Sequence, residues 1–329
     1  MDRIELDALS DTLLVKIRRK RGHPFDPGRM AKNLKTNREE LAVAVRHLKR
    51  LGYKIKIDKK GRITFSGAPD NFLPAEIANG LKTEMMGGRI YAYQSVQSTN
   101  LIAHKLAISE LSEGTLVIAE HQTRGKGRLG RSWHSPPKVG LYCSLILKPR
   151  IHPTLAPGLS LLTAVALTET ILSYGEIDVK IKWPNDVLVR GAKTAGILTE
   201  LSAEIGRTNF VIVGIGVNIN HRPGDFPKEL KKHATSIRIG LKKTIGRVEF
   251  LQRFLLTFEK EYFDFKRSGM TRLRKKILQY SSLLGQKIEL KMGRKTTSGI
   301  VIDIDETGHL VMDTKNGIQA FNAGEVSVR

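Results

Sequence analysis

The stretch Gly125-Lys126-Gly127-Arg128-Leu129-Gly130-Arg131-Ser132-Trp133-His134-Ser135-Pro136 interleaves three glycines with three cations and ends in an aromatic residue and a proline. Glycine has no Cβ, so backbone N–H groups in such a loop can approach an anion closely and adopt positive φ. Arg128 and Arg131 add planar guanidinium groups with several donors each. The pattern favours a phosphate-binding loop. A solvated basic loop and a disordered Arg-Gly segment that binds nucleic acid are the alternatives.

The spacing of this loop comes close to the nucleoside triphosphate motif G-x-x-x-x-G-K-[ST], with Gly125, Gly130, Arg131 and Ser132 in the matching positions. The lysine of the motif is missing. The prolines and the bulky residues that follow Ser132 cannot begin the long helix that the motif requires there. The loop therefore needs a different scaffold.

Two apolar runs flank the loop, and each is predicted to be a buried strand. Residues 115–120 lead the chain to Gln122, and residues 141–147 follow the loop. Packed strands on both sides would fix the loop ends, which weighs against disorder. The second run contains Cys143, the only cysteine in the chain, so internal disulfides and cysteine-rich zinc sites are excluded and a buried structural thiol is expected.

The totals indicate a globular protein with anionic partners. A chain of 329 residues has room for about two or three domains. No apolar run reaches the roughly 18 to 20 residues of a membrane span, and the N-terminus is not a signal peptide, so we expect a cytoplasmic protein with no membrane partner. With 55 Lys and Arg against 32 Asp and Glu, the formal charge is +23, which favours polyanionic partners without separating DNA, RNA and acidic proteins.

Residues 1–66 have the pattern of a winged helix-turn-helix. Apolar residues recur at helical spacing over 6–19, and further helices are predicted at 27–34 and from a cap at Thr36 or Asn37 to Leu51. Residues 53–57 alternate between apolar and charged, a turn follows, and residues 62–65 return as a second strand. This order of elements is that of a DNA-binding domain with a wing.

The charge of this region supports the same interpretation, because residues 1–66 hold 18 Lys and Arg against 8 Asp and Glu. The residues expected to bind DNA lie on the predicted recognition helix and are Arg38, Arg46, Lys49 and Arg50. Glu39 and Glu40, at the start of that helix, suit the helix dipole but repel phosphates. A solvated helix face is the alternative.

Residues 67–88 are rich in glycine and proline and are predicted to be a linker with one short helix at 74–81. A second domain is predicted over 89–282. Its expected strands are 90–93, 115–120, 141–147, 179–183, 187–189, 196–201 and 209–220, and its expected helices are 101–108, 157–174, 248–266 and 270–278. Five short strands with glycine turns then predict a small β-barrel over 283–329.

Other short motifs have two possible interpretations when taken alone. Ser98-Thr99-Asn100 precedes a helix, so Ser98 can be an N-cap or part of a site. Gly214 and Gly216 permit a ligand or a second backbone to approach their strand closely. The sequence around them lacks the third glycine and the helix of a dinucleotide fingerprint, so NAD binding is not supported.

Taken together, the motifs occur in the order found in one family. They are Ser98-Thr99-Asn100, Gln122 with residues 125–133, Lys182-Trp183-Pro184-Asn185-Asp186, residues 193–198, residues 214–218 and Gly324-Glu325-Val326-Ser327. On these residues, and over nearly its whole length, the chain resembles the bifunctional biotin protein ligases that double as biotin operon repressors.

The resemblance implies a multidomain α+β fold. Its parts are an N-terminal winged helix-turn-helix, a central ligase domain with a mixed sheet and helices, similar to class II aminoacyl-tRNA synthetases, and an SH3-like C-terminal β-barrel. It implies that ATP and Mg²⁺ are used to convert biotin into bound biotinyl-5′-AMP, and that a lysine of biotin carboxyl carrier protein, a subunit of acetyl-CoA carboxylase, accepts the biotin. Operator DNA of biotin genes and a homodimer formed through the central sheet are the other implied partners.

The resemblance also implies roles for individual residues. Lys193 and Arg128 are the implied catalytic residues. The implied biotin-binding residues are Ser98, Thr99, Asn100, Gln122, Lys126, Gly127, Arg128, Trp133 and Lys193. The implied adenylate- and ATP-binding residues are Gly125, Arg128, Arg131, Asn185 and Asp186. Asp186 is a candidate partner for Mg²⁺ or for a lysine, but Mg²⁺ is expected to be bound largely through the ATP phosphates, so no protein side chain is assigned as a metal ligand.

One position departs from the family pattern, which usually reads Gly-Arg-Gly-Arg where this chain has Lys126. Lysine supplies a point charge without the guanidinium fork, which bears on adenylate retention and repression. A lipoate-type ligase and a DNA-binding regulator that senses biotinyl-AMP without efficient transfer are the alternative functions. The glycine loop and the Trp-Pro-Asn-Asp turn favour biotin, and the complete motif set favours catalysis.

Overall fold

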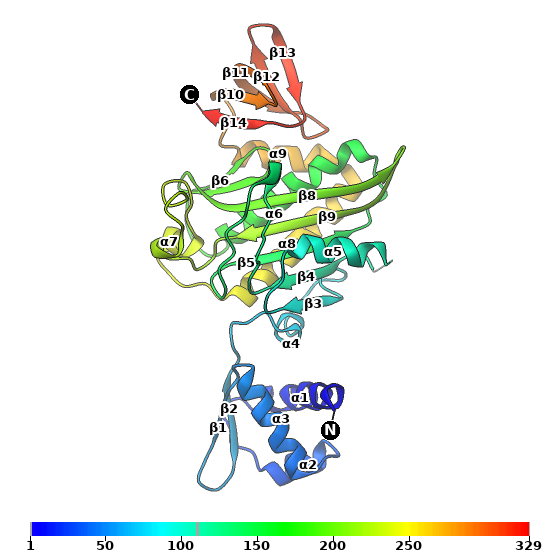
Figure 1. The fold of residues 1–329 in the computed structure, drawn as a ribbon, viewed down its shortest axis with the longest axis vertical. Coiled ribbons are helices and arrows are strands. Elements are labelled where there is room, and N and C mark those ends of the chain that lie inside the picture. The colour runs from blue at the N-terminus through cyan, green and yellow to red at the C-terminus, as the bar shows by residue number, and fades with distance from the viewer. Residues whose placement is uncertain (1, 110–111, 329) are drawn as a thin grey trace. The chain divides into compact units, whose positions relative to one another are not determined.

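The computed structural model describes residues 2–109 and 112–328, and the chain divides into two compact units between Asn71 and Phe72 (Figure 1). The first unit contains α1 (Arg3–Arg18), α2 (Pro27–Asn33), α3 (Arg38–Arg50), β1 (Lys54–Ile57) and β2 (Ile63–Gly67). The three predicted helices and the predicted hairpin are thus confirmed.

Side-chain caps and a small core define the helices of the first unit. Asp26 accepts a hydrogen bond from the backbone N–H of Arg29, and Asn37 accepts one from Glu40, so Asn37, not Thr36, is the N-cap of α3. Leu13, Ile17 and Leu41 are fully buried between the helices. The polar residues of α3 are consequently left on its outer face.

The second unit is built on a mixed sheet. Its helices are α4 (Pro74–Ala78), α5 (Thr99–Ile108), α6 (Ala156–Leu172), α7 (Ile237–Leu241), α8 (Arg247–Ser268) and α9 (Met270–Tyr280), with the short 3₁₀ turns η1 (Arg128–Gly130), η2 (Pro153–Leu155) and η3 (Pro223–Asp225). Its first strands are β3 (Ile90–Tyr93), β4 (Thr115–Ala119), β5 (Leu141–Leu147), β6 (Val179–Lys182), β7 (Asp186–Val189), β8 (Ala192–Glu204) and β9 (Arg207–Val217). Among the described residues these strands form a seven-stranded sheet in the order β3-β4-β5-β9-β8-β7-β6. Among the strands that the structure describes in this sheet, β3 and β4 are the one parallel pair, and the other neighbours are antiparallel.

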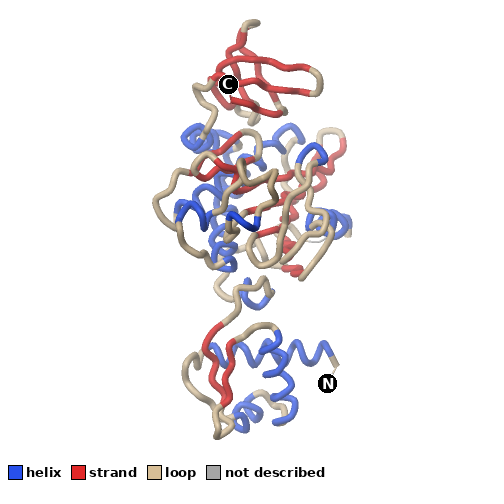
Figure 2. Tube along the Cα trace, turned by 60° about the vertical axis from the view of Figure 1, so that its left-hand side comes forward, coloured by secondary structure: helices blue, strands red, loops and turns tan. Residues whose placement is uncertain are grey.

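The two faces of this sheet carry different layers, as the alternation of side chains along each strand requires. Leu116 and Ile118 of β4 face the large core that contains α6 and α8. Val117, between them, faces a smaller cluster with Ala103 and Ala107 of α5. Helix α5 covers only part of that second face (Figure 1), and long loops run beside the strands (Figure 2).

Helix α6 is the central core helix, as its apolar sequence predicts. The stretch Pro153–Leu172 is long and apolar enough to cross a membrane by length and composition, but 72% of its apolar 18-residue window, whose mean hydropathy is 1.6, is buried inside the protein. It packs against α8, α9 and β8. The composition of α6 therefore reflects its place between the sheet and two other helices.

Residues 72–88 differ from the predicted linker, because they pack into the second unit. Ile77 and Met86 are fully buried in its core. The Glu259 carboxylate on α8 accepts hydrogen bonds from the backbone N–H groups of Glu84, Met85 and Met86 at 2.7 to 2.8 Å. Glycine and proline in this segment therefore shape a fixed path over α8.

A second, five-stranded antiparallel sheet ends the chain. It contains β10 (Lys287–Met292), β11 (Lys295–Ile304), β12 (Leu310–Thr314), β13 (Gly317–Phe321) and β14 (Glu325–Val328), in the order β13-β12-β11-β10-β14. Its apolar side chains join the core of the second unit. The indole Nε1 of Trp183 donates to the carbonyl of Gly308 at 3.0 Å, which fastens the Trp-Pro-Asn-Asp turn to this sheet. The peptide bond between Trp183 and Pro184 is cis.

Candidate active site

A cavity of about 450 Å³ opens on the face of the seven-stranded sheet that α5 covers only in part. It is lined by Ser98, Thr99, Asn100, Gln122, Lys126, Gly127, Arg128, Arg131, Trp133, Asn185, Asp186 and Lys193. The structure thus brings together every predicted ligand-binding residue of the second unit except Gly125. Segments separated by almost a hundred residues in the sequence meet here.

The floor of the cavity is made by glycines on neighbouring strands. Gly196 of β8 and Gly216 of β9 are paired across the sheet, and the indole of Trp133 lies over both. A Cβ on Gly196 would lie 2.9 Å from the indole, and one on Gly216 would overlap it. A Cβ on Gly214 would overlap the side chain of Asn100 in the same way. These glycines are needed because side chains from other segments occupy the space above them.

The start of α5 is held against the cavity by a chain of polar contacts. The backbone N–H of Thr99 donates to Oε1 of Gln122 at 2.8 Å, and Nε2 of Gln122 donates to Ser135 at 3.1 Å. Ser98 occupies the N-cap position of α5 but makes no side-chain cap hydrogen bond, and it is only 2% exposed. Ser98 therefore lines the cavity with a side chain that does not cap the helix.

The amide of Asn100 is already satisfied by the protein. Its Oδ1 accepts from Ser144 at 2.6 Å, and its Nδ2 donates to Glu200 at 2.6 Å. Ser144 lies on β5, and its hydroxyl is also within hydrogen-bond distance of the Thr99 hydroxyl, at 2.8 Å. Asn100 thus fixes the start of α5 on the sheet, and its role in this arrangement is to shape the cavity.

The glycine loop is a small hairpin with a 3₁₀ turn at its tip. Gly127 N–H donates to the carbonyl of Arg131 at 2.7 Å, and Trp133 N–H donates to the carbonyl of Gly125 at 2.8 Å. A Cβ on Gly125 would lie 2.6 Å from the carbonyl oxygen of Trp133. Gly125 therefore permits the two sides of the hairpin to approach at the base, which explains why it does not line the cavity. Leu129, at the tip, has φ of 55° and is 72% exposed.

Two loop arginines are oriented by different parts of the chain. The Arg128 guanidinium donates to Oδ1 of Asn185 at 2.9 Å. Burial lowers the pKa of Arg128 below its usual value, and the nearby carboxylates of Asp186 and Glu325 oppose this shift. Arg131 forms an ion pair with Glu325 at the start of β14. The C-terminal sheet thus contributes directly to the cavity.

Lys193 lies near the start of β8 and lines the cavity. Its Nζ is 2.7 Å from Oδ1 of Asp186 and 5.6 Å from the centre of the Trp133 ring. Its backbone is held on both sides, because Lys193 N–H donates to the carbonyl of His233 and Thr235 N–H donates to the carbonyl of Lys193. The ammonium group is therefore presented from a fixed backbone.

The charge of the lining favours an anionic ligand. Among the described residues that line the cavity, the Lys and Arg side chains are Lys126, Arg128, Arg131, Lys182 and Lys193, and the carboxylates are Asp186 and Glu325. Both carboxylates are paired with a cation of the site. The net positive charge inside a concave, partly apolar cavity suits a ligand with a carboxylate or phosphate group.

Comparisons with known proteins agree with this geometry. Residues 91–218 match the biotin/lipoate A/B protein ligase family, and residues 283–329 match the biotin protein ligase C-terminal domain. The chain is 36% identical to the bifunctional ligase/repressor BirA of Bacillus subtilis, over 96% of this chain and 97% of that protein. The chain belongs to the biotin protein ligase family.

Two further relatives define how far this similarity extends. BirA of Escherichia coli is 28% identical over 75% of this chain and 76% of its own length. A biotin protein ligase of Aquifex aeolicus, solved in complex with biotin and ATP, is 32% identical, covers 74% of this chain and 99% of its own, and superposes with a TM-score of 0.64.

Some residues of this biotin ligase site were not found by sequence reasoning. Ser144 and Glu200 hold Asn100, and Phe226 and Leu230 line the cavity from the loop after β9. A serine within the otherwise apolar run 141–147 was a usable signal for Ser144. The loop residues had no such signal, because an isolated Phe or Leu is more often a core residue.

Proposed function

We propose that this protein activates biotin with ATP to give biotinyl-5′-adenylate and pyrophosphate, and then transfers the biotinyl group to a lysine of the biotin carrier domain of an acetyl-CoA carboxylase. The observation that carries the proposal is the convergence of Arg128, Arg131 and Lys193 on one cavity with a glycine floor. Membership of the biotin protein ligase family and the motif set quoted above support it. A biotin–[acetyl-CoA-carboxylase] ligase of Mycobacterium tuberculosis is among the relatives, at 29% identity.

The first step needs positive charge at a fixed place. A biotin carboxylate oxygen attacks the α-phosphorus of ATP, the new P–O bond forms, and the bond to the β-phosphate bridging oxygen breaks to release pyrophosphate. Negative charge accumulates on phosphoryl oxygens as this happens. Lys193, held by Asp186 and by its backbone contacts, and Arg128, held by Asn185, supply cations that need little rearrangement.

The second step is an acyl transfer that water would intercept. The neutral amine of the acceptor lysine attacks the carbonyl carbon of the mixed anhydride, AMP leaves, and the amine loses its proton as the amide forms. The glycine loop, with Trp133 over the floor, covers the cavity and keeps the anhydride from solvent. The cations that attract the negatively charged phosphoryl group also slow dissociation of the adenylate.

Magnesium is proposed to enter with the nucleotide. The described residues contain no group of three or more His, Cys, Asp and Glu side chains placed to hold a metal ion. Asp186 and Glu325, the carboxylates of the cavity, are each paired with a cation. A Mg²⁺ ion carried by the ATP phosphates and water fits such a site, because Mg²⁺ commonly uses few protein ligands.

The test is biotin-dependent exchange of pyrophosphate into ATP by the purified protein. We expect exchange with biotin, and a mass gain of one biotinyl group on a carrier domain when that domain is added. Exchange with lipoate but not with biotin would overturn the substrate assignment. If the protein catalyses exchange with biotin but transfers it to no carrier domain, the protein would be a regulator that only forms or senses the adenylate.

A second function, repression through DNA, is proposed for residues 1–66. The order α1-α2-α3-β1-β2 fits a winged helix-turn-helix, with α3 as the recognition helix. The side chains of Arg38, Arg46, Lys49 and Arg50 are all exposed, whereas the apolar residues of α3 face the core. Operator DNA upstream of biotin genes is the proposed ligand, and the bifunctional relatives support it. An electrophoretic shift with and without biotin and ATP tests the proposal.

Two structural proposals complete this function. The five short antiparallel strands β10 to β14 are proposed to form an SH3-like domain. The chain is also proposed to form a homodimer through the central sheet, whose edge strands are β3 and β6. Sedimentation of the protein with and without biotin and ATP would measure dimer formation, and a monomer under all conditions would contradict it.

A further inference from the structure

Glu120 and Arg247 form a buried ion pair outside the cavity. Glu120 is the residue after β4, and Arg247 is the first residue of α8. Oε2 of Glu120 lies 2.7 Å from Nη1 of Arg247, and the two side chains are 5% and 2% exposed. Taking both charges out of water is costly, so the attraction between them is weak evidence of a purely stabilising role. The contacts of the pair with the segment that contains the glycine loop indicate a further role.

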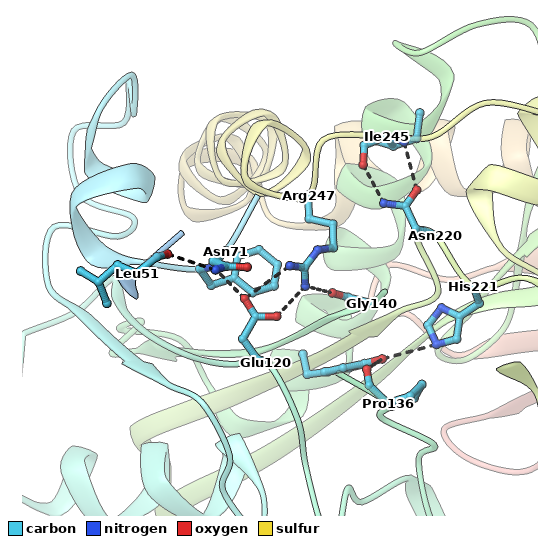
Figure 3. A network of polar contacts seen from close by, with 11 residues as sticks. Leu51, Asn71, Glu120, Pro136, Gly140, Asn220, His221, Ile245 and Arg247 are labelled. Atoms are coloured by element: carbon cyan, nitrogen blue, oxygen red, sulfur yellow. Dashed lines mark hydrogen bonds and ion pairs between the residues drawn. The ribbon is translucent and has the colours of Figure 1, made fainter. Parts of the chain in front are cut away.

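The Arg247 guanidinium contacts both ends of the segment that contains the glycine loop (Figure 3). One end is Glu120, two residues before Gln122. The other is Gly140, directly before β5, whose carbonyl accepts from Nη1 of Arg247 at 3.3 Å. Oε1 of Glu120 accepts in turn from the backbone N–H of Phe72 at 2.8 Å, and the guanidinium lies 4.6 Å from the centre of the Phe72 ring. The carboxylate and the guanidinium are thus fixed on several sides.

The glycine loop is joined to the sheet by two stems, the incoming one from Glu120 to Thr123 and the outgoing one that ends at Val139 and Gly140. A link is needed at this place because the two stems diverge. The pairing of β4 with β5 ends at Ala119 and Tyr142. The incoming stem then bonds toward β3 and α5, through Glu120 N–H to Tyr93 and Thr123 N–H to Val96. The outgoing stem bonds elsewhere, since Asn220 N–H donates to the carbonyl of Val139 at 2.7 Å. Arg247 bridges the gap that opens between the stems.

We propose that Arg247 is a positioning residue for the ligase reaction, acting through Glu120 and Gly140 to fix the spacing of the two stems and so the closed form of the glycine loop. The proposal rests on the proposed biotin ligase function. Neither Arg247 nor Glu120 lines the cavity. Their effect reaches the reactants through Gln122 and Trp133, which belong to the segment between Glu120 and Gly140 and do line the cavity. A small displacement of such groups has a large effect on a bound reactive intermediate.

The variant Arg247→Lys tests this, because lysine keeps the charge but cannot bond the carboxylate and the carbonyl with the fixed fork of arginine. We expect preformed biotinyl-5′-adenylate to dissociate about tenfold faster, and KM for biotin to rise similarly. The rate of transfer from bound adenylate to a saturating carrier domain should change less than about twofold, since the loop contributes to retention more than to this step. Glu120→Gln, which keeps the shape and the Phe72 contact, should act in the same direction.

The control is Arg253→Lys, an exposed arginine on the same helix that pairs with Glu249. It should keep adenylate retention at the wild-type value. Retention unchanged in both Arg247→Lys and Glu120→Gln would overturn the proposal. A uniform loss of binding, adenylation and transfer that follows a lower melting temperature would also overturn it, because that is the result of a merely structural role.

Hydrogen exchange of the ligand-free protein separates this inference from the proposed function. Arg247→Lys should increase deuterium uptake in residues 121–139 and leave uptake in β9 unchanged. If the wild-type protein forms no biotinyl adenylate, the proposed function fails while this change in the loop can still be observed. If uptake in residues 121–139 is unchanged, the positioning role fails whatever the enzyme assays give.

Discussion

The Nζ atom of Lys193 lies 2.7 Å from Oδ1 of Asp186, on the neighbouring strand β7. The pair places an ammonium group at the wall of the cavity, and the backbone bonds of Lys193 with His233 and Thr235 keep it there. Because the side chain of Lys193 is 38% exposed, the pair adds little to stability. Under the proposed function, the pair holds the cation where phosphoryl charge develops.

Lys193→Ala should therefore reduce adenylation far more than it reduces stability. We expect biotin-dependent pyrophosphate exchange to fall by about two to three orders of magnitude, the usual effect of removing one transition-state charge contact. Asp186→Asn should have a smaller effect, because the cation remains. Lys287→Ala, at an exposed position of β10, is the matched control and should keep wild-type exchange. Full exchange in Lys193→Ala would remove this residue from the site.

The glycine floor leads to a second prediction. A methyl group at Gly216 would overlap the Trp133 indole, so Gly216→Ala should push the ring off the floor of the cavity. Overpacking of this kind costs about 1 to 3 kcal/mol, so biotin affinity measured by calorimetry should fall about tenfold or more. Gly224→Ala is the control, since a Cβ there meets nothing within 4 Å and the residue has no positive φ. Equal affinities of the two variants would show that Trp133 does not depend on this glycine.

The elements and the site were largely predictable from the sequence, for a physical reason. The apolar runs at 115–120 and 141–147 predict two buried strands. Because these strands fix both ends of the glycine loop, they weigh against a disordered segment. The cap of α3 was predicted only to within one residue, because Thr36 and Asn37 are both good caps and the geometry alone selects Asn37.

What the sequence could not supply were contacts between distant segments. The linker prediction for residues 67–88 followed composition, which carries no information on the burial of Ile77 and Met86 against α8. The motif predicts that Gly125 binds the ligand. Its position at the base of the hairpin depends instead on the hydrogen bond from Trp133 N–H to its carbonyl, which the motif does not reveal. Glu120 and Arg247 are unremarkable in sequence because their pairing joins positions 127 residues apart.

Lys126 leads to a third prediction, since it stands where the family loop usually has arginine. It lines the cavity, and its backbone pairs with Ser132 across the loop hairpin. Lys126→Arg should slow adenylate dissociation by a few-fold, because a guanidinium can bond two phosphoryl oxygens at once. Lys126→Gln should accelerate it. Dissociation measured by chasing labelled adenylate with unlabelled biotin and ATP checks both, and equal rates for all three proteins would mean that this side chain does not reach the intermediate.

The first unit should show a strong salt response if it binds DNA. With about six phosphate contacts, operator affinity should fall on the order of a thousandfold between 50 and 200 mM salt. Arg46→Ala should reduce the slope of log affinity against log salt concentration by about one if Arg46 contacts a phosphate. Arg19→Ala removes one exposed charge from the same unit outside α3 and should have a smaller effect. Affinity that does not change with salt would argue against a DNA role.

His221 leads to a pH prediction. The ring is fully buried, stacks on Phe226 at 5.2 Å and lies 3.4 Å from the hydroxyl of Tyr142. Burial, with a smaller contribution from His134, lowers its pKa to about 4, while Asp225 raises it. The folded protein therefore keeps His221 neutral over a range in which the unfolded chain, with its ordinary pKa near 6.5, takes up a proton.

The sign of the effect follows from this difference in proton binding. Above about pH 6.5 His221 contributes no pH dependence, and between about pH 6.5 and 4 the unfolded state binds more protons, so stability should fall as the pH falls. The total loss should be about 3 kcal/mol, from about 1.4 kcal/mol per unit of pKa difference. Urea unfolding of His221→Gln should show a smaller slope of free energy against pH than wild type, whatever its stability at pH 7. His233→Gln, at an exposed position, should keep the wild-type slope. Equal slopes in wild type and His221→Gln would place the proton uptake on another group.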